Sequence, residues 1–327
     1  MSDSFKWGII GAGRIAGKFA SDLQTLRWAQ LHAVASRSSE RAKTFAEEYG
    51  AAHAFGSYEE ILDSGVEAVY VATRHPDHAA ATILCLENGI PVLCEKPFAM
   101  NAGEVQQMID TAKRNNTFLM EAIWTRFIPT TLKALELIEA GKIGEVISVK
   151  ADFGFKAKKD LSGRLYNKEL GGGSLLDIGI YPAFLSLLLL GKPTKILAHA
   201  AIGETDVDEE MAAILTYDNG KMAQIHSTIR ADSKTEAFIY GTEGVIHIHS
   251  RWHEPTSMSL LLPEERPQDF FFDYPCIGYA YEAEEVMTCL AAGKKESEAL
   301  PLSFSLDLIT LLDDIRKEIG LTYTADD

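Results

Sequence analysis

The first nineteen residues contain the segment that most constrains the fold, FKWGIIGAGRIAGKF at residues 5–19. An apolar run is followed by Gly11 and Gly13 in a tight glycine-rich turn, and apolar residues then recur at helical spacing. This order predicts a strand, a turn and a helix start of the kind that holds the pyrophosphate of a dinucleotide. Gly11 permits the turn, and Gly13 lets the phosphates approach the backbone. The N–H groups at the start of the helix, from Arg14 and Ile15 onward, are expected to bind them.

The end of the second strand indicates which dinucleotide is bound. A short apolar strand at residues 31–35 is followed by Ser36 and Arg37, whereas an NAD site usually has Asp or Glu there to hold the ribose 2′-OH. A guanidinium can bind a 2′-phosphate through two hydrogen bonds, and Arg41 lies one helical turn beyond. The alternative is that Ser36 and Arg37 only cap the helix predicted at residues 40–49. We predict NADP(H).

Strands and helices alternate through the first part of the chain. Further strands are predicted at residues 66–73, 91–94 and 117–120, with helices at 79–88 and 101–115 between them. Such alternation predicts a parallel sheet with helices on both faces, and hence a Rossmann-type domain over residues 1–122. Ligands of such sheets bind at the carboxyl ends of the strands. The polar residues at those ends are Thr73, His75, His78, Glu95 and Lys96.

The pattern changes at about Phe127, where a second domain over residues 123–327 is predicted. After a helix at 131–140, a strand at 146–155 and an apolar helix at 174–190, strand candidates follow in series. They lie at residues 195–202, 210–217, 223–230, 236–240, 245–249, 258–262 and 270–274. Asp218-Asn219-Gly220 between two of them is typical of a hairpin turn. Helices at 281–292 and 303–319 close the chain. We predict an α+β domain with an open, mostly antiparallel sheet.

Charge and cysteine content restrict the class of partner. The chain has 327 residues and a formal net charge of −16, which disfavours nucleic acid or an anionic membrane as a main partner. Its cysteines show no paired spacing and no histidine at metal-ligand spacing, so we expect free thiols, a cytoplasmic location and no metal. They are Cys85, Cys94, Cys276 and Cys289. The apolar segment at 174–190 contains Asp177 and Pro182 and is interpreted as a buried helix.

Two polar residues of that apolar helix could carry chemistry. Asp177 and Tyr181 are four residues apart and therefore share one helical face. A buried carboxylate needs a partner, and Lys96 is a plausible one. A nearby lysine also lowers the pKa of a phenol, which can then exchange a proton with a substrate hydroxyl. The alternative is an ordinary buried Asp–Tyr pair. Pro182 predicts a kink just after Tyr181.

These motifs together resemble one known family. They are Gly11, Gly13 and Ala16 at the first turn, Thr73 and His78, Glu95-Lys96-Pro97, and Gly171-Gly172-Gly173 followed by Asp177, Gly179 and Tyr181. The combination is similar to the glucose–fructose oxidoreductase/inositol dehydrogenase (Gfo/Idh/MocA) family. The segments at 121–127, 278–283 and 313–321 further resemble dimeric dihydrodiol dehydrogenases and their bacterial relatives. The resemblance covers essentially the whole chain.

The resemblance implies roles for particular residues. Lys96 would be the active-site lysine before a frequently cis peptide bond, Asp177 would orient it, and Tyr181 would be the acid/base. Many family members have His in place of Tyr181, and Arg74 and His75 depart from the commoner Pro-Asn. The cofactor-binding set would be Gly11, Gly13, Arg14, Ile15, Ser36, Arg37, Arg41, Thr73, His75, His78, Glu95, Lys96, Trp124 and Arg126. Substrate would contact Trp124, Phe155, Tyr181 and Trp252. The open sheet would form a homodimer or homotetramer.

The predicted reaction is hydride transfer between the nicotinamide of NADP(H) and a carbinol or carbonyl carbon of a sugar, polyol or cyclic diol. The alternative is a redox sensor or scaffolding protein that binds NADP(H) without turnover. The presence of Lys96, Asp177 and Tyr181 together favours the enzyme. A third activity of the family, redox-assisted glycoside cleavage, has no specific feature in this sequence.

Overall fold

The computed structural model describes residues 4–326. The chain divides into two compact units, and each unit contains two separate segments of it. Unit 1 comprises Met1–Trp124 and Tyr274–Leu306, and unit 2 comprises Thr125–Asp273 and Asp307–Asp327. The first crossing lies close to the boundary predicted after residue 122. The assignment of residues 274–306 differs from the predicted one, because these residues group with unit 1 instead of the second domain.

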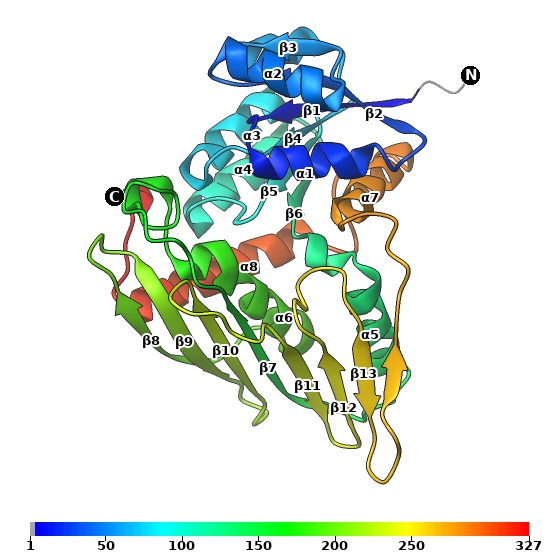
Figure 1. The fold of residues 1–327 in the computed structure, drawn as a ribbon, viewed down its shortest axis with the longest axis vertical. Coiled ribbons are helices and arrows are strands. Elements are labelled where there is room, and N and C mark those ends of the chain that lie inside the picture. Colours follow the sequence, from blue (N-terminus) through cyan, green and yellow to red (C-terminus); the bar gives the residue numbers. More distant parts are fainter. Residues whose placement is uncertain (1–3, 327) are drawn as a thin grey trace. The chain divides into compact units, whose positions relative to one another are not determined.

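Unit 1 contains a six-stranded parallel sheet of strand order β3-β2-β1-β4-β5-β6 (Figure 1). Its strands are β1 (Phe5–Ile10), β2 (Ala29–Ala35), β3 (His53–Phe55), β4 (Ala68–Val71), β5 (Val92–Glu95) and β6 (Leu119–Ala122). Its helices are α1 (Arg14–Leu23), α2 (Ser39–Tyr49), α3 (His78–Glu87), α4 (Ala102–Arg114) and α7 (Tyr279–Ala291), with short turns η1 (Glu59–Asp63) and η2 (His75–Asp77). Helix α1 contacts α2 and α7, whereas α3 contacts α4, so the helices form two groups. The predicted Rossmann-type sheet is confirmed; the short strand β3 was not predicted.

Two of these helices begin at side-chain caps, and the cap of α2 is Ser38 instead of Ser36 or Arg37. The side chain of Ser38 accepts a hydrogen bond from the Arg41 N–H at the start of α2. The side chain of Asn101 accepts one from the Glu104 N–H at 2.9 Å, and the Glu104 carboxylate accepts one from the Met100 N–H at 2.9 Å. Each cap satisfies N–H groups that have no partner within the helix.

A buried carboxylate explains why the segment after residue 274 belongs to unit 1. Asp22, at the end of α1, is 4% exposed and accepts hydrogen bonds from the N–H groups of residues 277–280. These N–H groups form the start of α7, whose positive end favours an acidic partner. A residue of the first helix thus caps a helix more than two hundred positions later, which the sequence pattern alone does not indicate.

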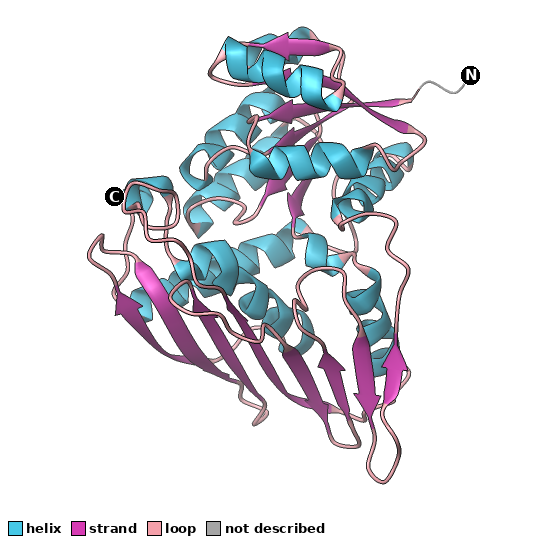
Figure 2. Ribbon diagram, in the orientation of Figure 1, coloured by secondary structure: helices cyan, strands magenta, loops and turns pink. Residues whose placement is uncertain are grey.

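Unit 2 contains an eight-stranded sheet of order β14-β13-β12-β11-β7-β10-β9-β8 (Figure 2). Its strands are β7 (Val146–Gly154), β8 (Lys195–Ile202), β9 (Asp208–Thr216), β10 (Met222–Thr228), β11 (Ala237–Gly241), β12 (Val245–Ile248), β13 (Met258–Leu261) and β14 (Gln268–Phe270). Neighbouring strands are antiparallel except for the parallel pair β7 and β10. The mostly antiparallel sheet and the 218–220 hairpin are confirmed. The strand expected at 270–274 is corrected to β14, because pairing with β13 ends at Phe270.

One face of this sheet is buried and the other is open. Residues such as Ala151, Ala213 and Ile225 are at most 4% exposed, and α6 (Ile180–Leu190) contacts β7 and β10. The alternate residues of the same strands point to the opposite face, as the two-residue period of a strand requires. There Leu197 and Ile214 are 48% and 41% exposed.

The remaining elements of unit 2 are η3 (Trp124–Arg126), α5 (Pro129–Glu139), η4 (Lys168–Leu170), η5 (Leu175–Gly179), α8 (Leu302–Glu318) and η6 (Thr324–Asp326). Two of them, η3 and α8, span the boundaries between the units.

The apolar helix predicted at 174–190 begins as a π-helical turn. The turn is η5, and the α-helix α6 starts only at Ile180. Pro182 therefore lies three residues beyond the π-helical turn, and the helix continues through it to Leu190. Among the described residues, Lys168–Leu190 is long and apolar enough to cross a membrane, but 83% of its most apolar window is buried within the protein. Such burial is typical of a core helix.

Candidate active site

The glycine-rich turn after β1 leaves room for an anion. Gly11 has φ +101, and a Cβ there would lie 2.5 Å from the carbonyl oxygen of Ala72, so only glycine fits. A Cβ on Gly13 would meet no atom within 4 Å, so that side of the turn is open. The N–H of Gly11 is bonded to the Ala35 oxygen at 2.9 Å, which ties the turn to β2.

The start of α1 fits the phosphates of a dinucleotide. Gly13 is the N-cap, no side chain caps the helix, and its first turn has no acidic residue. The helices α2 and α4, in contrast, are each capped by a side chain. The N–H groups of Arg14 and Ile15 belong to the first helical turn, where the helix offers them no acceptor. These residues would hold the pyrophosphate.

The carboxyl end of β2 carries the predicted 2′-phosphate residues. Ser36 is 4% exposed, whereas the Arg37 side chain is 60% exposed and its Nη1 lies 3.4 Å from the Asp77 carboxylate. Asp77 stands on η2, just after β4. The guanidinium is therefore accessible, but it already has one anionic neighbour.

Three arginines gather around one phenol beside this position. Burial raises the pKa of Tyr58; the positive charges of Arg37, Arg74 and Arg41 oppose that rise, and the charge of Asp77 adds to it. Their common influence on Tyr58 indicates a local concentration of positive charge within an acidic protein. The grouping of Arg37 with Arg41 was predicted, whereas the contribution of Arg74 was not. Its position in the loop after β4, where ligands of a parallel sheet bind, is the feature of the sequence that could have indicated it.

The loop after β5 carries Lys96. The peptide bond between Lys96 and Pro97 is cis, and the Lys96 N–H donates to the Glu95 carboxylate at 3.1 Å. Tyr70 donates a short hydrogen bond to the other oxygen of Glu95. His78 holds the next carbonyl, since its Nδ1 lies 2.8 Å from the Pro97 oxygen. Burial lowers the pKa of His78 to about 4, so the ring is neutral and Nδ1 donates.

A second buried glutamate fixes the far side of this loop. Glu121, on β6, accepts a hydrogen bond from the Phe98 N–H at 3.1 Å. Burial raises its pKa to about 7, and the charge of Lys96 acts in the opposite direction. Lys96 thus projects from a loop whose backbone is held by Glu95, His78 and Glu121.

The other predicted cofactor residues have varied surroundings. His75 is 5% exposed, and its ring lies edge-on to that of His78 with centroids 5.7 Å apart. The Thr73 hydroxyl lies 3.4 Å from the Arg74 carbonyl. Trp124 stacks on Tyr279 of α7 at 4.5 Å. Trp124 ends the first segment of unit 1, whereas the predicted cofactor residue Arg126 belongs to unit 2. The guanidinium of Arg126 lies 6.0 Å from the centroid of the Phe127 ring.

In unit 2, Asp177 forms an ion pair that was not predicted. Its carboxylate accepts a hydrogen bond from Nη1 of Arg164 at 2.8 Å. The Asp177 side chain is 11% exposed and that of Arg164 is 39% exposed, so the pair is partly shielded from solvent. The partner predicted from the sequence was Lys96. Arg164 lies in the loop before the triple glycine. Its spacing from Asp177 along the sequence matches no helical or strand period, so the sequence pattern did not predict this ion pair.

Tyr181 lies within a small group of rings. Its centroid is 5.7 Å from that of Phe153 and 5.1 Å from that of His253, and those two rings stack on each other at 3.9 Å. His253 is 3% exposed, and its carbonyl accepts a hydrogen bond from the Thr125 hydroxyl. Sequence reasoning missed His253 as a neighbour of Tyr181; its only signal was its place next to Trp252.

The predicted substrate-wall aromatics differ in their surroundings. Trp252 is 0% exposed and donates its indole N–H to the Asp152 carbonyl at 2.9 Å, which is the environment of a core residue. Phe155 is partly buried and packs against a cluster that contains Tyr166 and Ile178. Because Ile178 lies between Asp177 and Tyr181, Phe155 contacts the cluster that supports the predicted acid/base.

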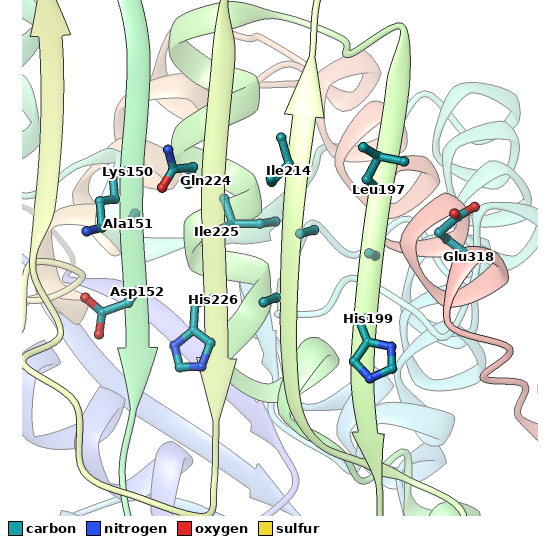
Figure 3. Close-up of a pocket in the computed structure, with 13 residues that line it drawn as sticks. Lys150, Ala151, Asp152, Leu197, His199, Ile214, Gln224, Ile225, His226 and Glu318 are labelled. Atoms are coloured by element: carbon teal, nitrogen blue, oxygen red, sulfur yellow. The ribbon is translucent and has the colours of Figure 1, made fainter.

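A hollow of about 470 Å³ lies on the open sheet face (Figure 3). It is lined by residues of β7, β8, β9 and β10, and by Glu318. They include Lys150, Leu197, His199, Ile214, Gln224 and His226. The lining contains none of the predicted site residues, so this hollow is distinct from the surroundings of Tyr181. Within residues 4–326, no group of three or more His, Cys, Asp or Glu side chains is arranged to hold a metal.

Two segments of the chain match known family models. Residues 5–123 match the model described as the Gfo/Idh/MocA oxidoreductase family with an NAD-binding Rossmann fold, and residues 131–247 match the C-terminal domain of the same family. The chain is 40% identical to trans-1,2-dihydrobenzene-1,2-diol dehydrogenase of Xenopus tropicalis, over 97% of this chain and 99% of that protein. It is 37% identical to the human protein of the same name, over 99% of each. The predicted likeness to dihydrodiol dehydrogenases is confirmed, and these two relatives are vertebrate proteins.

Solved structures share the fold over nearly the whole chain. A 3-ketoreductase from Actinomadura kijaniata in complex with NADP and TDP-benzene is 25% identical, with a TM-score of 0.87 over 97% of this chain and 98% of that one. Structures of the same ketoreductase include a lysine variant and a tyrosine variant. An aldose-aldose oxidoreductase from Caulobacter crescentus in complex with glycerol is 24% identical, with a TM-score of 0.88 over 97% of this chain and 98% of that one.

Proposed function

The chain belongs to the Gfo/Idh/MocA family of oxidoreductases, and from this premise we propose that it is an NADP(H)-dependent dehydrogenase or reductase. It transfers hydride between the nicotinamide and a carbinol or carbonyl carbon of a sugar, polyol or cyclic diol. The observation that carries the proposal is the phenol of Tyr181 at the start of a buried helix, four residues after Asp177, which is ion-paired with Arg164. The names of the relatives, which act on a cyclic diol, support the substrate class.

The proposed preference for NADP(H) rests on charge at the end of β2. Ser36 and Arg37 stand where a carboxylate would repel a 2′-phosphate, and Arg41 and Arg74 add positive charge around Tyr58. A phosphate monoester would compete with Asp77 for Arg37. The NADP complex of the ketoreductase is consistent with this preference.

The nicotinamide, when bound, supplies or accepts the hydride. In reduction, Tyr181 donates its hydroxyl proton to the carbonyl oxygen, and in oxidation it accepts the proton of the substrate hydroxyl. Lys96 stabilises the negative charge that develops on the substrate oxygen. Within unit 2, Arg164 holds the carboxylate of Asp177, which lies four residues before Tyr181, in place. Trp124 and Phe155 are the proposed apolar walls.

We also propose a homodimer or homotetramer that forms through the open face of the unit 2 sheet. Exposed apolar side chains on that face, among them Leu197 and Ile214, favour contact with a second apolar surface. The four cysteines are free, which suits the reducing conditions of the cytoplasm.

The test of the function is a screen followed by one substitution. Sugars, polyols and cyclic diols are tested with NADP⁺ and NADPH by the absorbance of the reduced nicotinamide. With a substrate identified, Tyr181→Phe keeps the ring and removes the exchangeable proton. We expect kcat to fall by about 10²–10⁴-fold, the contribution of a positioned acid or base, while the Kd for NADPH stays close to that of the wild type.

Two outcomes would contradict the proposal. Retention of most activity by Tyr181→Phe would make Tyr181 structural and leave Lys96 as the proton donor. Tight NADPH binding without turnover on any substrate class would favour the redox sensor instead.

A further inference from the structure

Three buried side chains form a hydrogen-bonded group where the π-helical turn η5 begins. The Ser174 hydroxyl and the Leu175 N–H both donate to Oδ2 of Asp208, each at 2.7 Å. The hydroxyls of Ser174 and Ser227 lie 2.9 Å apart. Ser174, Asp208 and Ser227 are all 0% exposed. Asp208 lies on β9 and Ser227 on β10, so this polar group joins the turn to two strands.

Glycines let both ends of the turn approach these residues. Gly173, just before the turn, has φ +115, and a Cβ there would lie 2.2 Å from Oδ1 of Asp208. Gly179, the last residue of the turn, would place a Cβ 2.8 Å from the Ser227 hydroxyl. Neither position accepts a side chain without displacement of a neighbour. The two strands therefore restrain the turn at its beginning and at its end.

The turn needs such restraint because its hydrogen-bond pattern is unusual. A π-helical turn holds one more residue than an α-helical turn and is frequently found at functional sites. If it relaxed to an α-helix, the residues after it would rotate by about 100° relative to those before it, since an α-helix has 3.6 residues per turn. Tyr181 lies two residues beyond the turn, and Asp177 lies within it. The direction of the Tyr181 side chain relative to that of Asp177 therefore depends on the one extra residue of the π-helical turn.

A side chain from the end of the chain also lies beside the start of the turn. Tyr323 is 3% exposed and donates its hydroxyl to the Gly172 carbonyl, beside the start of the turn. Burial, and then the charge of Asp208, raise the pKa of Tyr323, so its phenol stays neutral. Arg316 lies 5.3 Å from the Tyr323 ring.

We propose that Ser174, Asp208 and Ser227 are positioning residues that hold the π-helical turn in register and thereby aim Tyr181 for proton transfer. This inference rests on the proposed role of Tyr181. It assigns the three residues no contact with substrate or cofactor. Loss of the group leaves the helix in place but lets the phenol depart from the productive geometry, and a displacement of about 1 Å can cost about 10²-fold in rate.

The test compares three serine-to-alanine variants. Ser174→Ala and Ser227→Ala each remove one hydroxyl of the buried group. Ser186→Ala is the matched control, because Ser186 is also 0% exposed and lies on α6, where its hydroxyl bonds the Ala183 carbonyl of the same helix at 2.8 Å. For Ser174→Ala and Ser227→Ala we expect kcat to fall by about 10–100-fold, with KM and the NADPH Kd within about twofold of wild type. For Ser186→Ala we expect kcat to stay unchanged, whatever its thermal stability.

A double-mutant cycle shows whether the effect acts through Tyr181. Combined with Tyr181→Phe, the Ser174→Ala substitution should lower kcat no further, because the phenol that it misaligns is already inactive.

Each outcome has a defined meaning. Unchanged kcat in Ser174→Ala and Ser227→Ala, or an equal loss in Ser186→Ala, would overturn the positioning role. A further loss of kcat in the double mutant would also overturn it. The proposed function fails separately, because it requires loss of turnover in Tyr181→Phe alone.

Discussion

Arg37 is the residue on which the cofactor preference depends. Its side chain is accessible and stands at the end of β2, with Asp77 as its anionic neighbour at 3.4 Å. Arg37→Ala removes a charged donor that the 2′-phosphate would use. We expect the binding of NADPH to weaken by about 1.5–3 kcal/mol, the range for a hydrogen bond to a charged group, and that of NADH to change little.

Titration of both cofactors into the apoprotein measures this effect by fluorescence. Arg27→Ala is the control, since Arg27 is an exposed arginine beyond the end of α1. Equal losses for NADPH and NADH in Arg37→Ala would show that the guanidinium does not distinguish the phosphate.

Glu282 is a buried carboxylate that the proposed mechanism does not use. It is 0% exposed on α7, and among the described residues neither of its carboxylate oxygens has a hydrogen-bond partner. Burial, together with the charges of Glu95 and Asp22, raises its pKa well above the ordinary value of 4.5. A raised pKa in the folded state means that the ionised form is disfavoured there.

The stability of the protein should therefore depend on pH through Glu282. Its contribution is fully present below the unfolded-state pKa and is lost as pH rises toward the folded-state pKa. Glu282→Gln cannot ionise, so we expect it to unfold at a higher denaturant concentration than the wild type at pH 8, and the difference to shrink toward pH 5. Urea unfolding at several pH values measures this. A difference independent of pH would mean that Glu282 stays in one protonation state over that range.

At the scale of the element, the cap of α7 is a strong link within unit 1. The Asp22 carboxylate accepts N–H groups from residues 277–280 at distances of 2.7–3.3 Å. Asp22→Ala leaves these buried donors without an acceptor. We expect the free energy of unfolding to fall by about 2–3 kcal/mol, the upper range for hydrogen bonds to a charged group.

Asn101→Ala is the comparison for this cap. The Asn101 side chain accepts one N–H at the start of α4, so its loss should cost about 1 kcal/mol. Both variants are measured by urea unfolding at pH 7. Equal costs would indicate that the extra N–H groups of residues 277–280 find solvent or other acceptors when Asp22 is removed.

At the scale of the whole molecule, the open face of the unit 2 sheet predicts self-association. Ile214 is 41% exposed on β9, between β10 and the edge strand β8. Ile214→Asp places a charge among Leu197, Gln224 and other lining residues of the hollow. We expect light scattering to give a dimer or tetramer for the wild type and a lower-order species for Ile214→Asp at micromolar concentration, because a desolvated unpaired charge opposes association.

Leu132→Asp is the matched control, since Leu132 is 47% exposed but lies on α5 and not on the sheet. It should leave the oligomeric state unchanged. A monomeric wild type would exclude the proposed assembly, and dissociation by Leu132→Asp alone would place the contact on α5.

Much of unit 1 follows from local sequence. The turn at Gly11 and Gly13, the apolar strands and the Asn101 cap each lie within a short stretch, and the alternation of strand and helix leaves few topologies for a parallel sheet. The second sheet was also predictable in kind, because strands in series with the 218–220 hairpin favour antiparallel pairing. The sequence motifs likewise indicated Lys96, Asp177 and Tyr181 as the residues for chemistry.

The tertiary structure decided which distant residues support them. Arg164 pairs with Asp177, the His253 ring lies next to that of Tyr181, and Asp22 holds the start of α7 in unit 1. None of these partners has a spacing that a helical or strand period can predict. Local periodicity reports which face of an element is buried, whereas the partner of a buried polar group depends on how separate elements pack, and only the folded chain determines that.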